Sequence, residues 1–419
     1  MAGLRRRVVL TGAGCLTSVG NDVPSTWAAL LDGRSGGGPI TRFDASGFKV
    51  RFAHEVKGFD IGAYMDRKEA KRADRYTQYA MAAAVQAMRD AGLGEGTGTG
   101  YDPDRLGVII GSGIGGIETF EAQHTVLMQD GPGRISPFFV PMFIGDIAAG
   151  VVSMRFQAKG PNYATQSACA SSAHAIGDAF RLIAYGDADL MIAGGSEAAV
   201  SPMAIGGFAN MQALSTRNES PETASRPFDQ TRDGFVLGEG SGVVILEELA
   251  HARARGAQIY CEVVGYGATG DAYHLTGQPE DHAGLQRAMR RALEDAGLAP
   301  SDVQYVNAHG TSTPLNDSNE IRAIKAVFGP HATGLNVSST KSSTGHMLGA
   351  AGAVEAIVSA LTIRHGIIPP TINLHTPDPE CDLDCTANTP VRREVQAALS
   401  NSSGFGGHNA SIALRRLIG

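Results

Sequence analysis

The stretch Gln166-Ser-Ala-Cys-Ala-Ser-Ser-Ala-His-Ala-Ile-Gly177 places one cysteine, Cys169, among small residues, and a helix-like segment, DAFRLIAYGDADL, follows at once. The thiolate is the nucleophilic form of cysteine, and a helix N-terminus can lower the pKa of a thiol. The position therefore suits an activated nucleophile. A small buried core residue is the alternative, because most free cysteines are buried, and this stretch alone leaves both open.

Short β-branched segments alternate with alanine-rich, helix-like segments along the whole chain. This alternation is typical of an α/β protein with buried strands. The segments RRVVLTGAG, DRLGVIIGSG, ADLMIAGGSEA and SGVVILEEL predict strands in the first half, and QIYCEVVGYGATG, VQYVNAHGT and GLNVSST predict strands in the second. Helices are predicted over 70–93, from Cys169 to about Tyr185, and over 315–328 and 346–365.

Two segments of the chain look like copies of one unit. AVQAMRDAGL (84–93) precedes DRLGVIIGSG, and AMRRALEDAGL (288–298) precedes SDVQYVNAHGT, with Asp-Ala-Gly-Leu before a comparable strand each time. The match supports a duplicated α/β unit. Because sites in parallel sheets form beyond the carboxyl ends of the strands, residues that follow predicted strands are expected to converge there.

Composition excludes several classes of protein. The 419-residue chain is 43% hydrophobic and 18% charged, as in ordinary globular proteins, and its net charge of −7 argues against a general nucleic-acid binder. It has no stretch of about 18 or more uncharged apolar residues, so no membrane span is expected, and no signal peptide is expected either. Five cysteines at scattered spacings favour reduced thiols in a cytoplasm. Cys381 and Cys385 lack a second pair of ligands at zinc-site spacing, so no metal is expected.

Two histidines and a glycine-rich loop are further candidates for the site. His309 in NAHGTSTP and His346 in KSSTGHMLGAAGA each follow a predicted strand and stand among Gly, Ser and Thr. Two neutral imidazoles can donate hydrogen bonds to one oxygen and stabilise negative charge that develops on it, whereas a bond to a nearby backbone carbonyl is the alternative for each ring. The glycines of NSSGFGGHN (401–409) let the backbone approach a ligand closely, or else form a tight turn between two strands.

These residues together carry a resemblance to a known family. Its motifs run in the family's order through nearly the whole chain: SACASSAHAIG, GDADLMIAGGSEA, ALSTRN, ASRPFDQTRDGFVLGEG, VNAHGTSTPLND, SSTKSSTGHMLGAAGAVEA, PPTINL and GFGGHN. The intervals of 140 residues from Cys169 to His309 and of 37 from His309 to His346 also suit the family. The chain resembles the elongating β-ketoacyl-ACP synthases, specifically the synthase II class, which are condensing enzymes of type II fatty-acid synthesis that work with an acyl carrier protein (ACP).

The resemblance implies a fold and a reaction. The fold is thiolase-like, with two duplicated α/β halves in five layers, αβαβα, usually as a homodimer; the cysteine lies in 1–255, and both histidines and the glycine-rich gating loop lie in 256–419. In the implied reaction, Cys169 takes the acyl chain from acyl-ACP as a thioester. Malonyl-ACP then loses CO2, and the resulting carbanion attacks the thioester to give β-ketoacyl-ACP. Sulfur suits both half-reactions because it is a good nucleophile and a good leaving group.

The resemblance also assigns roles to single residues. His309 and His346 would stabilise the enolate oxygen as neutral donors. The backbone N–H groups of Cys169 and Phe405 would form the oxyanion hole for the acyl thioester, and the Phe405 ring would gate the acyl pocket. No bound cofactor is implied, because the phosphopantetheine arm arrives on the carrier protein.

Other residues would support the chemistry by resemblance. Lys341, with Glu355 as its partner, would set the charge around His346, unless the two form only a surface ion pair. The implied substrate contacts are Thr311 and Thr313 on the phosphopantetheine arm, and Ile114 and Phe208 in the acyl pocket, although the last two could equally be ordinary core.

The segment MDRKEAKRADRYTQY carries basic residues at helical spacings in an otherwise acidic protein. They are Arg67, Lys68, Lys71, Arg72 and Arg75. A carrier protein is acidic, so by resemblance this cluster is the carrier dock. A solvated helix face is the alternative.

Two positions depart from the family pattern. The family's closing loop usually reads Asn-Ser-Phe-Gly-Phe-Gly-Gly, whereas Ser403 stands here in place of the first aromatic residue, which suggests a roomier or differently moving gate. Gln212 stands where an arginine is often found near the carrier entrance. Type II polyketide ketosynthases can also carry Ser-Gly-Phe-Gly-Gly, so a ketosynthase of a polyketide or polyene pathway, possibly paired with a chain-length factor, is the alternative function.

Overall fold

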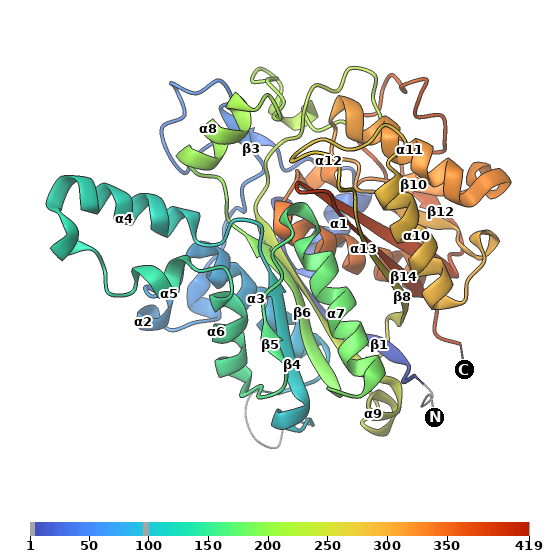
Figure 1. Cartoon of the computed structure of the whole chain (residues 1–419), viewed down its shortest axis with the longest axis horizontal. Helices are drawn as coiled ribbons and strands as arrows, with labels where there is room; N and C mark the ends of the chain where they lie inside the picture. The colour runs from blue at the N-terminus through green and yellow to red at the C-terminus, as the bar shows by residue number, and fades with distance from the viewer. Residues whose placement is uncertain (1–4, 95–99, 419) are drawn as a thin grey trace.

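The computed structural model describes residues 5–94 and 100–418. The strands of its N-terminal half are β1 (Val8–Leu16), β4 (Leu106–Gly111), β5 (Asn162–Tyr163), β6 (Leu190–Glu197) and β7 (Gly240–Glu248). Those of its C-terminal half are β8 (Cys261–Gly270), β9 (Tyr305–Asn307), β10 (Asn336–Ser338), β13 (Ala397–Gly404) and β14 (His408–Arg415). Within the described residues these strands form one mixed sheet in the order β10-β9-β13-β14-β8-β1-β7-β6-β4-β5 (Figure 1).

The two halves of the sheet repeat one topology. In the N-terminal half, β4 runs parallel to β5 and β6, and β7 runs antiparallel to β6 and β1. In the C-terminal half, β9 runs parallel to β10 and β13, and β14 runs antiparallel to β13 and β8. The halves join where residues 8–10 of β1 pair with residues 261–263 of β8. The shared strand order and directions bear out the fold of two duplicated halves.

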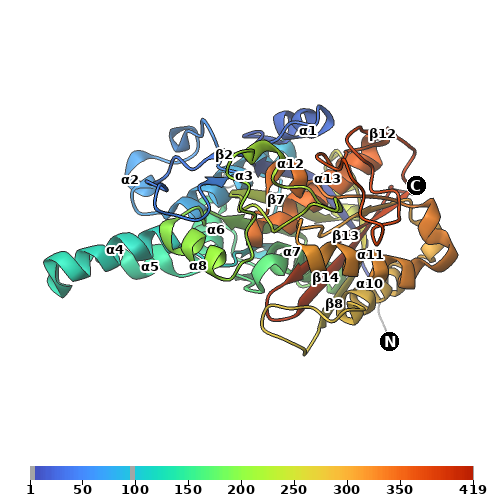
Figure 2. The ribbon, with the colours of Figure 1, turned by 90° about the horizontal axis from the view of Figure 1, so that it is seen from above.

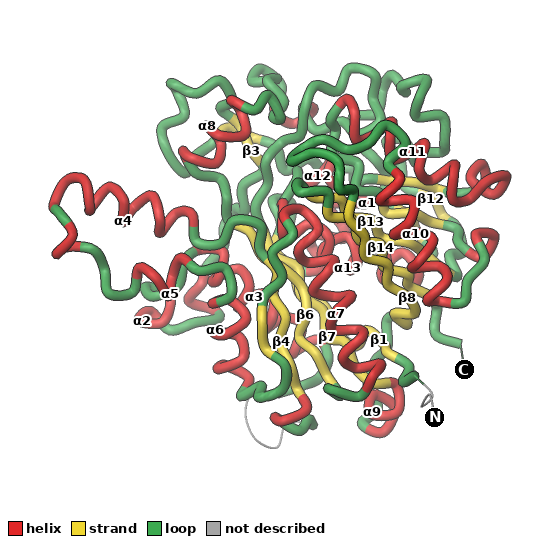
Figure 3. Tube along the Cα trace, viewed as in Figure 1, coloured by secondary structure: helices red, strands yellow, loops and turns green. Residues whose placement is uncertain are grey.

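Helices cover and separate the two halves of the sheet. They are α3 (Arg75–Asp90), α6 (Ile147–Phe156), α7 (Ser171–Tyr185), α10 (Ala283–Ala296), α11 (Pro314–Phe328) and α13 (Ala351–His365). α3 and α6 cover the outer face of the N-terminal half, and α10 with α11 covers that of the C-terminal half. α7 and α13 lie between the halves and contact each other (Figures 1 and 3). The five layers are therefore αβαβα, as the resemblance implies.

The central position of α13 follows from its sequence. AGAVEAIVSALTI carries one charged residue, Glu355, and no continuous polar face, and each of its residues is buried in the structure. A helix without a polar face has to be buried all round. α7 packs closely on β8 because Gly177 has no side chain. A Cβ at Gly177 would lie 2.3 Å from the ring of Tyr266 on β8, so a larger side chain would push the helix off the sheet.

Separate apolar cores fill the spaces between the layers. One lies between α3, α6 and the N-terminal half of the sheet. A second lies around α7 and α13, between the two halves. A third packs α10 and α11 on the C-terminal half. Burial of apolar side chains in these layers is what holds the halves together.

Shorter elements complete the described chain. The helices are α1 (Val23–Leu31), α2 (Arg67–Ala70), α4 (Ile117–Asp130), α5 (Phe139–Phe143), α8 (Pro202–Asn210), α9 (Leu249–Ala254) and α12 (Lys341–Thr344). Two small hairpin-like sheets are β2 (Gly38–Pro39) with β3 (Phe52–Ala53), and β11 (Ile367–Ile368) with β12 (Val391–Arg392). α4 and α5 form an arm that projects from the body of the molecule (Figures 1 and 2), which the sequence analysis does not foresee. None of the described helices has the length and apolar character that a bilayer crossing requires.

Two predicted helices begin later than expected. The helix predicted over 70–93 is interrupted, because Asp66 caps α2 and Asp74 caps α3 with side-chain oxygens that accept backbone N–H groups. The helix predicted from 346 begins at Ala351, because Leu348 has a left-handed φ of 45°. His346 is thereby left in a loop at the end of α12.

The parallel strands place the candidate site. His309 follows the carboxyl end of β9, Lys341 follows β10, Phe405 follows β13, and Glu197 ends β6. These strand ends lie at one edge of the two halves, as expected for a site in a sheet of this type.

Candidate active site

Cys169 lies in a short 3-10 turn, Ala168–Ala170, that leads directly into α7. The turn requires small neighbours: Ala168 has a left-handed φ of 50°, and a Cβ at Gly404 would lie 2.5 Å from the Ser167 carbonyl oxygen and 3.1 Å from the Cys169 nitrogen. The side chain is 8% exposed. The close approach of Gly404 brings the glycine-rich loop onto the cysteine's backbone.

The thiol of Cys169 is protonated near neutral pH. Burial raises its pKa to about 12, although Lys341 and the backbone N–H groups of Phe405 and Cys169 lower it. The sequence predicts an activated nucleophile at the start of α7; burial opposes the charged form of this thiol, and Lys341 and the two N–H groups favour it. The same contacts stabilise the anion that forms when sulfur loses its proton during attack.

His309 and His346 meet edge to face, with ring centroids 5.3 Å apart and planes at 86°. Burial, with Lys341 close by, holds the pKa of each imidazole well below its ordinary value, so both rings are neutral. Neither Nδ1 atom has a hydrogen-bond partner within the described part of the chain. This favours the tautomer with hydrogen on Nε2, which can donate to a substrate oxygen.

Lys341 and Glu355 form a buried ion pair. Their side chains are 1% and 2% exposed, so the alternative of a surface ion pair is wrong. Burial raises the pKa of Glu355, and Lys341 opposes that rise. The Lys341 charge also acts on Cys169 and on both imidazoles.

Two buried carboxylates that the sequence analysis leaves out hold the backbone of the site. Glu320 on α11 accepts the N–H groups of His309 and Gly310 at 2.9 and 2.8 Å. Glu197 accepts those of Gly113, Ile114 and Gly349 at 2.7, 3.1 and 2.9 Å. Glu197 stands in the quoted motif GDADLMIAGGSEA, where a carboxylate among apolar and glycine residues is a signal that could have found it. Glu320 follows VNAHGTSTPLND among polar residues and carries no such signal.

One cavity of about 650 Å³ joins the candidate residues. Those of its lining residues that the sequence analysis names are Cys169, His309, His346, Thr311, Thr313, Ile114, Phe208, Phe405, Gln212 and Ser403. The ring of Phe405 lies 6.4 Å from that of Phe208, centroid to centroid, at the tip of the loop between β13 and β14. The cavity thus has a thiol, two neutral donors and apolar walls in one space.

Thr311 and Thr313 line the same cavity. Their hydroxyl oxygens are 3.0 Å apart, a hydrogen-bond distance. Gln212 lines the cavity from the segment after α8, where its backbone has a left-handed φ of 57°.

The basic cluster divides into two parts. Arg67, Lys68, Lys71 and Arg72 are exposed around α2, which suits a surface that meets an acidic partner. Arg75 opens α3 instead and donates from Nε to Glu118 on the arm at 3.1 Å. The uniform helical spacing predicted for the cluster is therefore wrong, because the chain turns between the two helix caps.

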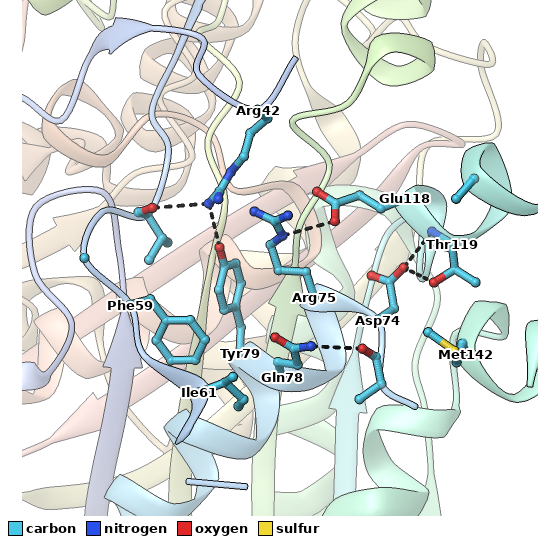
Figure 4. A pocket seen from close by; sticks show the side chains of 14 residues that line it. Arg42, Phe59, Ile61, Asp74, Arg75, Gln78, Tyr79, Glu118, Thr119 and Met142 are labelled. Atoms are coloured by element: carbon cyan, nitrogen blue, oxygen red, sulfur yellow. Dashed lines mark hydrogen bonds and ion pairs between the residues drawn. The ribbon is translucent and has the colours of Figure 1, made fainter. Parts of the chain in front are cut away.

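Figure 4 shows a second cavity, of about 580 Å³, around this ion pair. Arg75 points toward Glu118, Asp74 accepts from the Thr119 hydroxyl, and Arg42 reaches the hydroxyl of Tyr79. Its lining residues include no cysteine or histidine, so this cavity lacks the nucleophile of the first. Among residues 5–94 and 100–418, no group of three or more His, Cys, Asp or Glu side chains could hold a metal ion.

Comparison with known proteins agrees with this geometry. The chain matches the family described as Beta-ketoacyl synthase, N-terminal domain, over residues 5–252 and Beta-ketoacyl synthase, C-terminal domain, over residues 260–375. It is 54% identical to 3-oxoacyl-[acyl-carrier-protein] synthase 2 of Staphylococcus aureus (strain COL), over 98% of each chain.

Two solved structures are similar over 99% of this chain and 100% of theirs, each with a TM-score of 0.91. One is a type II PKS acyl-carrier protein in complex with its ketosynthase bound to the hexaketide, at 37% identity, and the other is the ishigamide ketosynthase/chain length factor, at 36%. With both domains matched and more than half of its residues shared with a full-length relative, the chain belongs to the beta-ketoacyl synthase family, in the elongating synthase II class.

Proposed function

We propose that the protein is a 3-oxoacyl-[acyl-carrier-protein] synthase that extends acyl chains in type II fatty-acid synthesis. The observation that carries this proposal is the cavity that holds the Cys169 thiol together with two neutral imidazoles, His309 and His346. A thiol can carry an acyl group, and two neutral donors can hold an enolate oxygen. The identity to a 3-oxoacyl-[acyl-carrier-protein] synthase 2 supports the same function.

In the first half-reaction, the Cys169 sulfur attacks the acyl-ACP thioester. The backbone N–H groups of Cys169 and Phe405 hold the oxyanion, the acyl group passes to Cys169, and the proton leaves with the phosphopantetheine thiol. Both N–H groups already act on the sulfur, which supports this role. Ile114 and Phe208 line the path of the acyl chain, and the Phe405 ring gates it.

In the second half-reaction, malonyl-ACP loses CO2. His309 and His346 donate hydrogen bonds to the enolate oxygen, and the enolate carbon attacks the Cys169 thioester. β-Ketoacyl-ACP forms, and the sulfur leaves and regains a proton. Lys341, held by Glu355, stabilises negative charge in the cavity, while Thr311 and Thr313 bind the phosphopantetheine arm. No cofactor of the protein's own is required.

The partner is an acyl carrier protein that docks on the exposed basic residues around α2. Positive charge for an acidic surface comes from the side chains of Arg67, Lys68, Lys71 and Arg72. Arg75 adds less to this charge, because Glu118 pairs with it. We place this reaction in the cytoplasm, in keeping with five cysteines that are all free and buried.

A second copy of the chain covers the arm and the end of the sheet in this proposal. The strand β5 ends the sheet and leaves an edge open to pairing. Apolar side chains are exposed on β5, on α6 and along the α4–α5 arm: Leu127, Met128, Phe138, Val140, Ile144, Met154 and Tyr163. A homodimer would bury them, and each protomer would keep its halves over 1–255 and 256–419.

A polyketide or polyene ketosynthase is the second candidate. Ser403 in the loop and the similarity to a type II PKS ketosynthase favour it. Such an enzyme would pair with a chain-length factor rather than with itself.

The test is a mass-spectrometric assay of the purified protein with acyl-ACPs of graded length and malonyl-ACP. Acylated Cys169 and β-ketoacyl-ACP from ordinary saturated chains, without a second subunit, are the expected result. Activity that requires a second subunit or polyketo chains would replace the first proposal with the second. Absence of acylation at Cys169 with every carrier would refute both.

A further inference from the structure

Ser403 and Asn409 are the cross-strand pair just outside the tip of the glycine-rich loop. They face each other in the register of β13 and β14, with Gly404 and His408 as the next pair and Phe405 beyond it. The Ser403 hydroxyl donates to Asn409 Oδ1 at 2.8 Å, and both side chains are buried. Contacts that hold the Ser403–Asn409 pair in place therefore also hold the base of the loop that carries Phe405.

His282 lies against this pair from another part of the chain. Its Nε2 is 3.3 Å from the Ser403 oxygen, and the side chain is fully buried. It stands just before α10 with a left-handed φ of 47°, and its backbone N–H donates to the Pro279 carbonyl at 2.9 Å. A residue with a Cβ rarely keeps such a backbone unless its surroundings hold it there.

The direction of each hydrogen bond in this cluster can be deduced. Asn409 donates from Nδ2 to Asp271 Oδ1 at 2.7 Å, so its Oδ1 is the acceptor that faces Ser403. The Ser403 hydrogen therefore points to Asn409, and the Ser403 oxygen accepts from Nε2–H of His282. His282 Nδ1 is then a bare acceptor, and within the described structure it has no partner.

The chain of bonds continues into the loop itself. Asn409 Nδ2 also reaches the Gly407 carbonyl at 3.3 Å, and the Asp271 N–H donates to the same carbonyl at 2.9 Å. The Gly406 N–H donates to the Leu275 carbonyl at 2.7 Å. His282 is thus the far end of a series of donors that terminates on the backbone beside Phe405.

We propose that His282 is a positioning residue that holds the Phe405 loop in this chain, in place of the aromatic ring that the family usually carries at position 403. The imidazole occupies the buried space next to Ser403 and orients its hydroxyl, and through it Asn409. The inference rests on the proposed function, because a correctly placed Phe405 N–H and ring matter for acyl transfer to Cys169. His309 follows β9 and His346 follows α12, so the donors to the enolate oxygen are not carried by the loop itself, and decarboxylation is the comparison step.

The experiment compares variants of the full-length protein. His282→Gly suits the left-handed backbone and removes only the side chain, and Ser403→Phe restores the ring. His282→Gly is expected to slow acylation of Cys169 by acyl-ACP on the order of 10-fold or more, with malonyl-ACP decarboxylation unchanged. The double variant His282→Gly/Ser403→Phe should acylate at least about 5-fold faster than His282→Gly, because the ring refills the space. His282→Gln, which can also donate to Ser403, should keep most of the activity.

A second measurement is independent of activity. Backbone hydrogen exchange over 403–409 should be faster in His282→Gly than in the wild type, and slower again in the double variant. His251→Gln on α9, a partly buried histidine paired with Glu247, is the matched control and should leave both measurements unchanged.

The outcomes separate this inference from the proposed function. Equal acylation and equal exchange in wild type and His282→Gly, or a double variant no better than His282→Gly in either measurement, would overturn the role of His282. A wild type that is never acylated would instead refute the proposed function, and the exchange data alone would then decide whether His282 holds the loop.

Discussion

The imidazoles of His309 and His346 approach edge to face, 5.3 Å between centroids, although the two residues follow different strands of the C-terminal half. Both are buried and neutral, because desolvation and the nearby Lys341 charge disfavour a second proton. Two neutral donors so close together can bond one oxygen that gains negative charge. The proposed decarboxylation therefore depends on this pair.

Loss of one imidazole should separate the two half-reactions. His346→Ala is expected to slow release of CO2 from malonyl-ACP by about 10²–10³-fold, since one donor to the enolate oxygen is lost. Acylation of Cys169 should stay near the wild-type rate, because its oxyanion is held by backbone N–H groups. Radiolabelled CO2 release and intact-protein mass spectrometry measure the two steps, with His251→Gln as control. Equal losses in both steps would contradict separate oxyanion sites.

Cys169→Ala should show the converse pattern. The acyl adduct should be absent from the mass spectrum, because no sulfur remains to carry it. Release of CO2 from malonyl-ACP should continue, since His309 and His346 are untouched. Cys15→Ala, at another buried free cysteine, is the matched control and should still be acylated. An adduct that persists in Cys169→Ala would assign the nucleophile to another residue.

Removal of one partner of the buried Lys341–Glu355 pair should destabilise the fold strongly, whereas replacement of both partners by apolar residues should destabilise it much less. Glu355→Leu leaves an ammonium group buried without its partner, so the free energy of unfolding should fall by about 3–5 kcal/mol. The double variant Lys341→Met/Glu355→Leu should regain much of that stability, because no charge remains to be buried. Urea unfolding measures both.

Catalysis should not recover with stability in the double variant. Without the Lys341 charge, the Cys169 anion and the enolate both lose a stabilising contact. A stable double variant with wild-type activity would show that Lys341 serves the fold and not the reaction.

The carrier dock should depend on the exposed basic residues more than on Arg75. Lys68→Glu or Arg72→Glu should weaken binding of an acidic carrier protein several-fold, and added salt should reduce the difference. Arg75→Gln should have a smaller effect, because the Arg75 side chain already pairs with Glu118. Fluorescence anisotropy with a labelled carrier at two salt concentrations is the measurement. A larger loss in Arg75→Gln than in Lys68→Glu would place the dock nearer the arm.

Glu320 should make stability depend on pH. Burial raises the pKa of Glu320 to about 7, although the N–H groups of Gly310 and His309 lower it. The folded protein therefore holds this proton more tightly than the unfolded chain. The resulting stability is complete below the ordinary glutamate pKa and is lost as the pH rises through about 7.

Glu320→Gln should flatten this dependence. Urea unfolding of wild type between pH 5 and pH 8 should show a larger fall in unfolding free energy than the variant does. Glu294→Gln, at an exposed glutamate on α10, should behave as wild type. Identical pH dependence in wild type and Glu320→Gln would show that Glu320 does not titrate in this range.

Much of the architecture could be predicted because its signals are local. Alternating strand-like and helix-like segments and the repeated Asp-Ala-Gly-Leu each depend on a short stretch of chain, and they predicted a duplicated α/β unit; the αβαβα layering came from the resemblance to the family. The sequence did not predict the α4–α5 arm. Most of its residues are exposed, so its apolar residues do not recur at the regular spacing that marks a helix packed on a core.

The chain's own order of residues determined which side chains are available: a cysteine in a small-residue turn before a helix, two histidines after strands, and a glycine loop around Phe405. Only the tertiary structure decided how far these side chains are buried, which protonation state burial favours and which residues they contact. Packing from distant elements buries Cys169 and keeps it a thiol, carries His282 across 121 residues to Ser403, and turns Arg75 toward Glu118. The reason is physical: residue type and spacing are local, whereas desolvation and hydrogen-bond partners depend on which remote segments the fold brings alongside.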